Sequence, residues 1–325
     1  MNRRMALRIL ALGLAAVSAR VGAQQSGRVP VIGLLITHPP VDDVVVDMLR
    51  SGLREFGYED GKNCMIEVRS ALGQLDRVPV LAQELVDHPA DVIVIVNEVA
   101  ARAVMEATRT IPVVVVGYIN EPVSMGWIES YRRPGDNLTG VFAVDLSLGP
   151  KRLEILKEAI PELSRVAVLW DPAFGKREFD DIGIAARSLG LELVPVEVRR
   201  ADDLLTALET IRREKAGAAI LTWSPVFWVQ RARVGAIYRE AAVPVISPMS
   251  VVAEAGGLLS YGSDNAYNWV RAAYFIDRLL KGAKAAEMPI EQAMRIKLTV
   301  NLRTADTLGV TIPQSILIRA DEVIR

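Results

Sequence analysis

Short apolar runs alternate with segments of helical periodicity along most of the chain, and this alternation constrains the fold more than any other feature. Residues 113–116 are all valine, which is typical of a strand buried on both faces of a parallel sheet. Val45, Leu49 and Leu53 follow an earlier apolar run at helical spacing. Such alternation predicts a parallel sheet with helices on both faces. The expected strands of the first half are 29–36, 64–68, 91–96 and 111–116, and the expected helices are 42–57, 76–87 and 100–108.

The second half of the chain repeats this plan. Gly190 ends an expected helix as Gly57 does in the first half, and Pro244 precedes a strand as Pro112 does. A single sheet rarely takes so many regular units, so we expect two lobes of the same architecture. A chance similarity between α/β units is the alternative. The expected strands here are 165–170, 191–198, 217–222 and 243–246, and the expected helices are 151–160, 177–189, 201–215 and 229–241.

The predicted fold class is therefore α/β, with two doubly wound parallel-sheet lobes. We expect the first lobe to comprise residues 24–142 together with 265–325, and the second lobe to comprise residues 143–264. This division assigns the expected helices 265–280 and 302–308 and the expected late strand 295–300 to the first lobe. It requires a hinge in which the chain crosses between the lobes several times.

Residues 1–23 have the three parts of a secretory signal peptide. A basic segment with three arginines in the first eight residues precedes an apolar segment at 9–17, and small residues follow at 21–23. The apolar segment is far shorter than the ~20 residues of a membrane-spanning helix. We therefore expect export to the periplasm with cleavage near Ala23; a buried N-terminal helix is the alternative.

Polar and aromatic residues gather where the expected strands end. Ligands of doubly wound sheets bind at the carboxyl ends of the strands, and flat rings combined with a few polar groups suit a small molecule. Glu98 and Glu121 could accept the ammonium group of a ligand. Each polar residue could instead cap a helix or form a turn, and each aromatic could belong to the core. The candidate ligand-binding residues are Thr37, His38, Asn97, Glu98, Tyr118, Asn120, Glu121, Trp170, Ser224 and Tyr261.

Charge and composition argue against several classes of function. Lys and Arg total 38 against 39 Asp and Glu, which gives no electrostatic reason to expect nucleic acid as a partner. One cysteine and two histidines leave no disulfide, no thiolate metal cluster and little material for a catalytic triad. No nucleophile elbow, zinc motif, phosphate loop or dinucleotide motif is present. We therefore expect a binding protein with no cofactor and no metal, and not an enzyme.

A further signal lies in segments spread in order along the chain: 52–63 (GLREFGYEDGKN), 121–140, 151–172, 254–262, and a tail with VNLRTA at 300–305 and RADEVI at 319–324. These segments resemble the substrate-binding proteins of ABC transporters, in particular those related to tryptophan and tyrosine uptake. The resemblance covers nearly all of the chain after the signal peptide. It implies a two-lobed periplasmic binding protein of the first structural type, which closes on a small molecule and delivers it to a membrane permease. It also implies a monomer.

The chain departs from the family pattern at the expected site. Glu121-Pro122 stands where family members often carry Asp-Pro, and Asn97-Glu98 stands at a helix start that is often small and Thr-Pro-Ala-like. The ligand is therefore left open between an amino acid and an aromatic acid. Two other functions remain as alternatives. One is a periplasmic ligand-sensing subunit of a signalling system, and the other is an exported α/β enzyme using Glu98 or Glu121 as acid or base.

Overall fold

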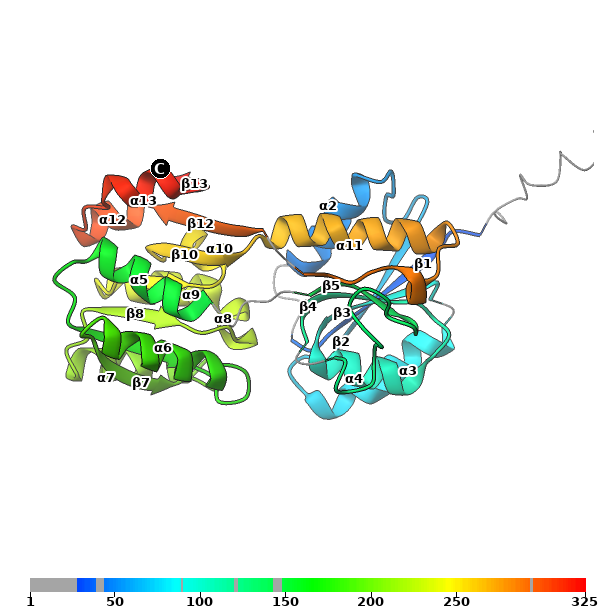
Figure 1. Ribbon diagram of the computed structural model, residues 1–325, viewed down its shortest axis with the longest axis horizontal. Helices are drawn as coiled ribbons and strands as arrows, with labels where there is room; N and C mark the ends of the chain where they lie inside the picture. Colours follow the sequence, from blue (N-terminus) through cyan, green and yellow to red (C-terminus); the bar gives the residue numbers. More distant parts are fainter. Residues whose placement is uncertain (1–27, 39–43, 89, 120–121, 143–147, 293–294) are drawn as a thin grey trace, which may run out of the picture.

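The computed structural model describes residues 28–38, 44–88, 90–119, 122–142, 148–292 and 295–325, so the expected signal peptide lies outside the described residues. The described chain forms two lobes, each with one sheet between layers of helices (Figure 1). The first sheet has six strands in the order β11-β5-β4-β3-β1-β2, and the second has seven in the order β13-β12-β10-β9-β8-β6-β7. The predicted fold class, α/β with two parallel-dominated sheets, is confirmed.

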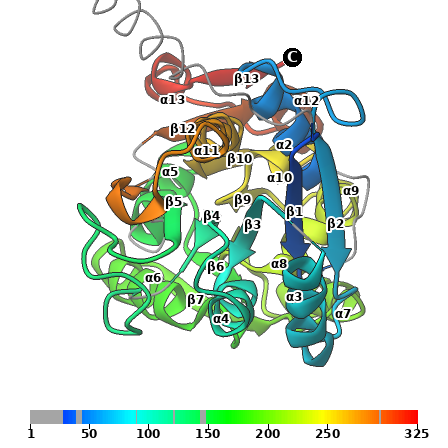
Figure 2. The same ribbon diagram turned by 90° about the vertical axis from the view of Figure 1, so that its right-hand side faces the viewer.

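The first lobe is a fully parallel sheet among the described residues, with β1 and β2 side by side at one edge (Figure 2). Helices α3 and α4 cover one face, and α2 and α11 cover the other. Its elements are β1 (Val31–Ile36), α2 (Val44–Arg54), β2 (Met65–Ser70), α3 (Val78–Asp87), β3 (Val92–Asn97), α4 (Glu98–Ala107), β4 (Val113–Tyr118), β5 (Leu138–Phe142), α11 (Asn265–Leu280) and β11 (Glu291–Gln292).

The second lobe repeats the arrangement, with β12 added antiparallel to β10. Helices α5, α6, α12 and α13 pack on one face, and α7 to α10 pack on the other. Its elements are α5 (Gly149–Ala159), β6 (Arg165–Trp170), α6 (Lys176–Ser188), β7 (Glu192–Glu197), α7 (Asp203–Arg213), β8 (Ala218–Leu221), α8 (Pro225–Val229), α9 (Arg231–Glu240), β9 (Val245–Ser247), α10 (Ser250–Glu254), β10 (Leu259–Ser263), β12 (Ile296–Asn301), α12 (Leu302–Leu308), α13 (Gln314–Arg319) and β13 (Glu322–Ile324).

The valine run of β4 shows why the apolar strands are uninterrupted. Val113 and Val115 pack in the core on the α3 and α4 side of the sheet. Val114 and Val116 pack in the core on the α2 and α11 side. A strand with helices on both faces has no solvent-facing side, so successive residues are all apolar.

The strand order places a crevice in each lobe. The order β2-β1-β3-β4-β5 of the first sheet reverses direction at β1 and β3, and the order β7-β6-β8-β9-β10 of the second reverses at β6 and β8. Ligands of open α/β sheets bind outside the carboxyl ends of the strands at such a reversal. The fold therefore directs attention to the residues that follow β1, β3, β6 and β8.

The C-terminal part of the chain differs from the sequence-based division. That division places residues 265–325 in the first lobe, and α11 and β11 do lie there. Residues 296–325 instead belong to the second lobe, because β12 pairs with β10 and β13 pairs with β12. Leu298 and Val300 of β12 complete the apolar core on the α5 side. Figure 1 shows the chain leaving α11 over the first lobe and returning through β12.

Two of the segments that cross between the lobes are joined by a hydrogen bond and an ion pair. Asp264 lies between β10 and α11, and its carboxylate accepts a hydrogen bond from the Tyr267 N–H at 3.2 Å, which caps the helix. The N–H of Asp264 donates to the carbonyl of Arg295 at 2.9 Å. The Arg295 guanidinium also lies 3.2 Å from the Asp264 carboxylate. The strand leaving the second lobe and the strand entering it are therefore held together at the crossing.

The single cysteine provides a check on the packing of the first lobe. Cys64 is fully buried, and burial together with the nearby charge of Asp60 raises the pKa of its thiol to about 11. Only the thiolate reacts with a disulfide reagent, so the native protein at pH 8 is expected to react roughly 100-fold or more slowly than a free cysteine of pKa ~8.5. Ellman's reagent measures this, with the guanidinium-unfolded chain as control. Prompt reaction of the native protein would contradict the burial.

Candidate functional site

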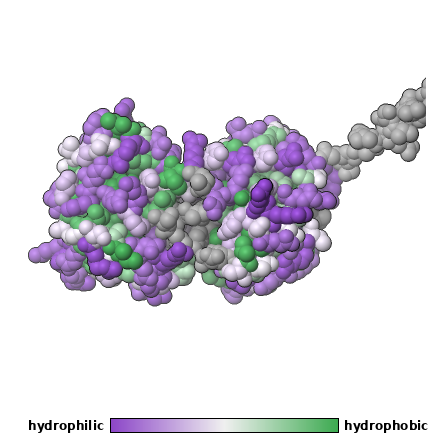
Figure 3. Space-filling model, viewed as in Figure 1, coloured by the Kyte–Doolittle hydropathy of each residue, from purple (hydrophilic) through white to green (hydrophobic). Residues whose placement is uncertain are grey.

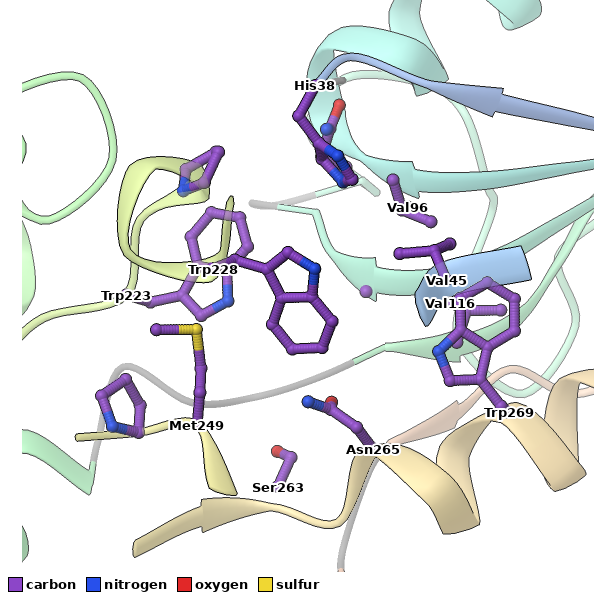
Figure 4. A pocket seen from close by; sticks show the side chains of 14 residues that line it. His38, Val45, Val96, Val116, Trp223, Trp228, Met249, Ser263, Asn265 and Trp269 are labelled. Atoms are coloured by element: carbon purple, nitrogen blue, oxygen red, sulfur yellow. The ribbon is translucent and has the colours of Figure 1, made fainter. Parts of the chain in front are cut away.

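A pocket, here called the inner pocket, lies between the two lobes at the carboxyl ends of the strands (Figure 4). The first lobe contributes the ends of β1, β3 and β4 and the starts of α2 and α11, and the second lobe contributes the segments after β8 and β9 and the end of β10. The lining residues of the first lobe are His38, Val45, Val96, Asn97, Val116, Gly117, Asn265 and Trp269. Those of the second lobe are Trp223, Pro225, Trp228, Pro248, Met249 and Ser263.

Three tryptophans dominate the inner pocket. Trp223 and Trp228 come from the second lobe and Trp269 from the first, and Figure 4 shows the Trp228 ring projecting into the space between them. Trp228 packs against the apolar cores of both lobes, and so does Met48 of α2. Flat rings from opposite walls suit an aromatic or apolar group of a small molecule. Because Trp228 contacts both lobes, it also couples the pocket to the relative position of the lobes.

Trp228 lies on the short helix α8, whose N-terminus is capped by Ser224. Ser224 is fully buried, and its hydroxyl accepts a hydrogen bond from the Val226 N–H at 3.1 Å. The same hydroxyl donates to the carboxylate of Asp171 at 2.9 Å, and that carboxylate accepts from the Ala173 N–H at 2.9 Å. The ends of β6 and β8 are thereby joined, which fixes where α8 starts and where Trp228 points.

A buried ion pair supports the neighbouring Trp223. Arg152 of α5 and Glu178 of α6 are 0% and 1% exposed and form a direct salt bridge. Glu178 also accepts a hydrogen bond from the backbone N–H of Trp223 at 3.0 Å. Arg152 donates to the backbone carbonyl of Tyr261 at 2.8 Å. The pair thus links two helices, the end of β8 and β10 directly behind the pocket wall.

On the first lobe, Asn97 ends β3 and caps α4. Its side-chain oxygen accepts from the Ala100 N–H at 3.0 Å, and its amide nitrogen donates to the Thr37 hydroxyl at 2.8 Å. Both ends of the amide are therefore used by the protein itself. The hydrogen bond between Asn97 and Thr37 joins the two strands at which the sheet order reverses, and so it holds the first-lobe wall in place.

Gly117 allows the backbone of β4 to approach β3 closely at the pocket. Its φ is +155°, and a Cβ atom at this position would lie 2.1 Å from the carbonyl oxygen of Val96. The register between the two strands shifts between Ile95 and Asn97, next to this contact. A side chain at position 117 would push the strands apart, so glycine is required for this part of the pocket wall.

A second pocket, here called the outer pocket, shares Asn97 and Trp223 with the inner pocket and also draws on both lobes. From the first lobe it takes the start of α4, and from the second it takes the loop after β6 and the start of α6. Its lining residues are Asn97, Glu98, Val99, Arg102, Pro172, Ala173, Phe174, Lys176, Arg177 and Trp223. The outer pocket is the charged part of the cleft, whereas the inner pocket is largely apolar.

The structure brings some of the sequence-predicted residues together and separates others. His38 and Asn97 line the inner pocket, and Glu98 joins Asn97 in the outer pocket. Thr37 and Ser224 stand directly behind the wall through the hydrogen bonds given above. Trp170 stacks on Phe179 with ring centroids 4.7 Å apart, and Tyr261 packs against the core of the second lobe, so neither lines either pocket. Tyr118 is paired in register with Asn97 through the backbone, and Asn120 and Glu121 lie outside the described residues.

Several pocket residues are not among the sequence-predicted ones. Trp228 lies on a helix rather than at a strand end, and Trp269 lies in the first turns of α11. Ser263 and Asn265 flank the crossing between β10 and α11. The sequence could have identified this last pair from the expected return of the chain to the first lobe near residue 265. A segment that crosses between two lobes lies at the base of the cleft between them. Trp223 lies at a strand end beside Ser224 and is one of the aromatics that the strand-end pattern points to, although the list of candidates does not include it.

Two further classes of site find no support in the part of the chain that the structure describes. No group of three or more His, Cys, Asp or Glu side chains there could hold a metal ion. None of the helices described has both the length and the apolar character needed to cross a membrane. The surface in Figure 3 is mainly hydrophilic over both lobes on the face shown.

Comparison with known proteins gives a consistent picture. A family model described as ABC transporter substrate binding protein matches residues 29–324. A tyrosine-binding protein of Clostridioides difficile is 22% identical over 279 residues, covering 85% of this chain and 79% of that protein.

Among solved structures, a conserved domain protein from Vibrio cholerae is similar with a TM-score of 0.78 and 25% identity, covering 91% of this chain and 100% of that one. An ABC domain from Streptococcus pneumonia in complex with L-Trp has a TM-score of 0.77 and 25% identity, with the same coverage. A ligand-free, open substrate-binding protein from Clostridium difficile, at 21% identity and a TM-score of 0.63, shares the fold and covers 91% of this chain and 99% of that one.

Proposed function

The chain belongs to the ABC transporter substrate-binding protein family, and we propose that it captures an amino acid or an aromatic acid between its two lobes for delivery to an ABC importer. The observation that carries this proposal is the inner pocket, to which both lobes contribute tryptophans. A ligand held by both walls stabilises the closed arrangement of the lobes, and a membrane permease can recognise that arrangement. The family consists of binding proteins rather than enzymes, so the protein acts by binding and release.

The relatives support an aromatic ligand. One relative is a tyrosine-binding protein and one similar structure holds L-Trp. Trp223, Trp228 and Trp269 supply rings that a planar ligand can pack against. Ser263 and Asn265 supply neutral hydrogen-bonding groups at the floor of the same pocket (Figure 4). The proposal therefore covers ligands with one aromatic ring system and a small polar part.

The N-terminal pattern supports export of the protein to the periplasm as part of the same proposal. The signal peptide is cleaved near Ala23, and the mature protein works as a monomer with its permease in the membrane. It needs neither a cofactor nor nucleic acid. Residues 1–23 carry the basic, apolar and small-residue segments on which this part of the proposal rests.

A thermal-shift screen of the mature protein tests the proposed function. The library holds the proteinogenic amino acids together with aromatic carboxylic acids. A ligand that binds only the folded state raises the melting temperature, since at 100 times its Kd it adds about 2.7 kcal/mol of stability. At least one compound of either class is expected to produce a saturable shift. A folded protein that shows no shift with any of them would contradict the proposal.

A further inference from the structure

We propose that Ser263 selects the ligand by its ring, and that the Ser263 hydroxyl accepts a hydrogen bond from an N–H or O–H group on the aromatic ring system. This inference rests on the proposed function and narrows it, because the proposed function does not distinguish a phenyl ring from an indole or a phenol. The hydrogen bond involves the ring alone, and it sets no condition on the charge of the rest of the ligand.

The Ser263 hydroxyl is a buried polar group that the protein leaves without a partner. The residue is 9% exposed, and its hydroxyl forms no hydrogen bond with any part of the chain that the structure describes. Ser263 lines the inner pocket, and Figure 4 shows its oxygen turned toward the pocket. An unpaired buried hydroxyl costs free energy, and a ligand atom that pairs with it removes that cost. A bound molecule therefore gains affinity by carrying a polar atom at this place.

The backbone holds Ser263 in a fixed position at the pocket. Ser263 is the last residue of β10, and it is paired with β12. The next residue, Asp264, caps α11 and is hydrogen-bonded to the segment that precedes β12. On the other side, a Cβ atom at Gly262 would lie 2.0 Å from the carbonyl oxygen of Pro248, so β10 lies close against the segment after β9. The hydroxyl can therefore rotate but cannot leave the pocket, which lowers the ordering cost of binding to it.

The aromatic walls bring the ring of a ligand to this hydroxyl. Trp228 and Trp269 line the inner pocket from opposite lobes, and Ser263 lies at the floor of the same pocket (Figure 4). A ring that packs on these tryptophans therefore directs an edge toward the floor. An edge with only C–H groups covers the hydroxyl without pairing it, whereas an N–H or O–H group pairs it. A serine hydroxyl accepts as well as donates, so both kinds of ring suit it.

Water competes with the ligand for this hydroxyl in solution. A ring that displaces a bound water without replacing its hydrogen bond loses affinity, and a ring with its own N–H or O–H group does not. A pocket that hydrogen-bonds a ligand group also rejects the analogue that lacks the group better than an apolar pocket can. One such hydrogen bond corresponds to about tenfold in Kd. Ser263 is therefore expected to favour indole and phenol rings over phenyl rings by about this factor.

Isothermal titration of the mature protein with matched pairs of ligands tests the inference. The head group is constant within each pair, and the ring gains or loses its polar hydrogen. The pairs are L-tyrosine with L-phenylalanine, L-tryptophan with its benzothiophene analogue, and p-hydroxyphenylpropionate with phenylpropionate. In the pair that binds most tightly, the member with the N–H or O–H group is expected to bind about tenfold more tightly. Ser263→Ala is expected to weaken that member about tenfold and to leave the other within about twofold.

Ser260→Ala is the matched control, because Ser260 lies in the same strand, is 1% exposed and lines neither pocket. It is expected to leave the difference within the pair unchanged. An equal loss for both members in Ser263→Ala would mean that the hydroxyl meets the shared head group, and this result would reject the ring contact. Equal affinities of the two members for the unaltered protein would also reject it, and both results leave the proposed function standing.

No binding by any pair would reject the inference as well, and the thermal-shift screen would then decide the proposed function separately. Circular dichroism of each variant shows whether it is folded.

Discussion

Glu178→Leu is expected to lower the free energy of unfolding by about 3–5 kcal/mol, because it removes the buried carboxylate that pairs with the buried guanidinium of Arg152. The substitution also removes the acceptor of the Trp223 N–H. Leucine fills a similar volume, so the loss reflects charge and hydrogen bonding rather than a cavity. Urea unfolding followed by circular dichroism measures the effect.

Two further variants separate the buried pair from ordinary surface charges. Arg152→Leu combined with Glu178→Leu is expected to be more stable than Glu178→Leu alone, because both members of the buried ion pair are then replaced by apolar side chains. Glu192→Leu breaks the exposed pair with Arg165 in the same lobe and is expected to cost less than about 1 kcal/mol. A cost for Glu178→Leu no greater than that for Glu192→Leu would show that the pair does not support the pocket wall.

Trp228→Ala is expected to weaken binding of the best library ligand by about 2–3 kcal/mol, roughly 30- to 150-fold in Kd. The loss has two sources. The ring supplies apolar contact area in the inner pocket, and it also packs against the cores of both lobes. Isothermal titration gives the affinity, and small-angle scattering with and without ligand reports whether the lobes still close.

A tryptophan outside the pockets provides the control for this variant. Trp170 stacks on Phe179 within the second lobe, so Trp170→Phe is expected to leave the affinity within about twofold. Equal losses in the two variants would mean that the effect comes from general destabilisation. An unchanged affinity in Trp228→Ala would remove the inner pocket as the ligand site.

The sequence predicts the fold well because buried strands can be recognised in it as continuous apolar runs. Strands covered on both faces must be apolar at every position, which is why β4 and its neighbours are recognisable. The helices α11 and α12 have the expected bounds, Asn265–Leu280 and Leu302–Leu308. The assignment of β12 to a lobe fails for a physical reason. The apolar pattern of a strand is the same in either lobe, so it does not show which sheet the strand joins. That choice depends on tertiary contacts.

The candidate site is predicted less completely than the fold. Strand ends identify His38, Asn97 and Glu98, because the carboxyl ends of parallel strands meet at one edge. They also select Trp170, whose side chain stacks on Phe179 of α6 and does not line either pocket. Alternate residues of a strand face opposite layers, so position at a strand end does not decide which way a ring points. Trp228 and Trp269 reach the pocket from helices, and only the packing of the two lobes brings them together.

A crystal structure of the mature protein with its best library ligand tests the central claim most directly. The predicted result is a small molecule enclosed between the lobes, with its aromatic or apolar part against Trp223 and Trp228 and a polar group within hydrogen-bond distance of Ser263. A ligand bound to one lobe alone, away from these side chains, would contradict the claim.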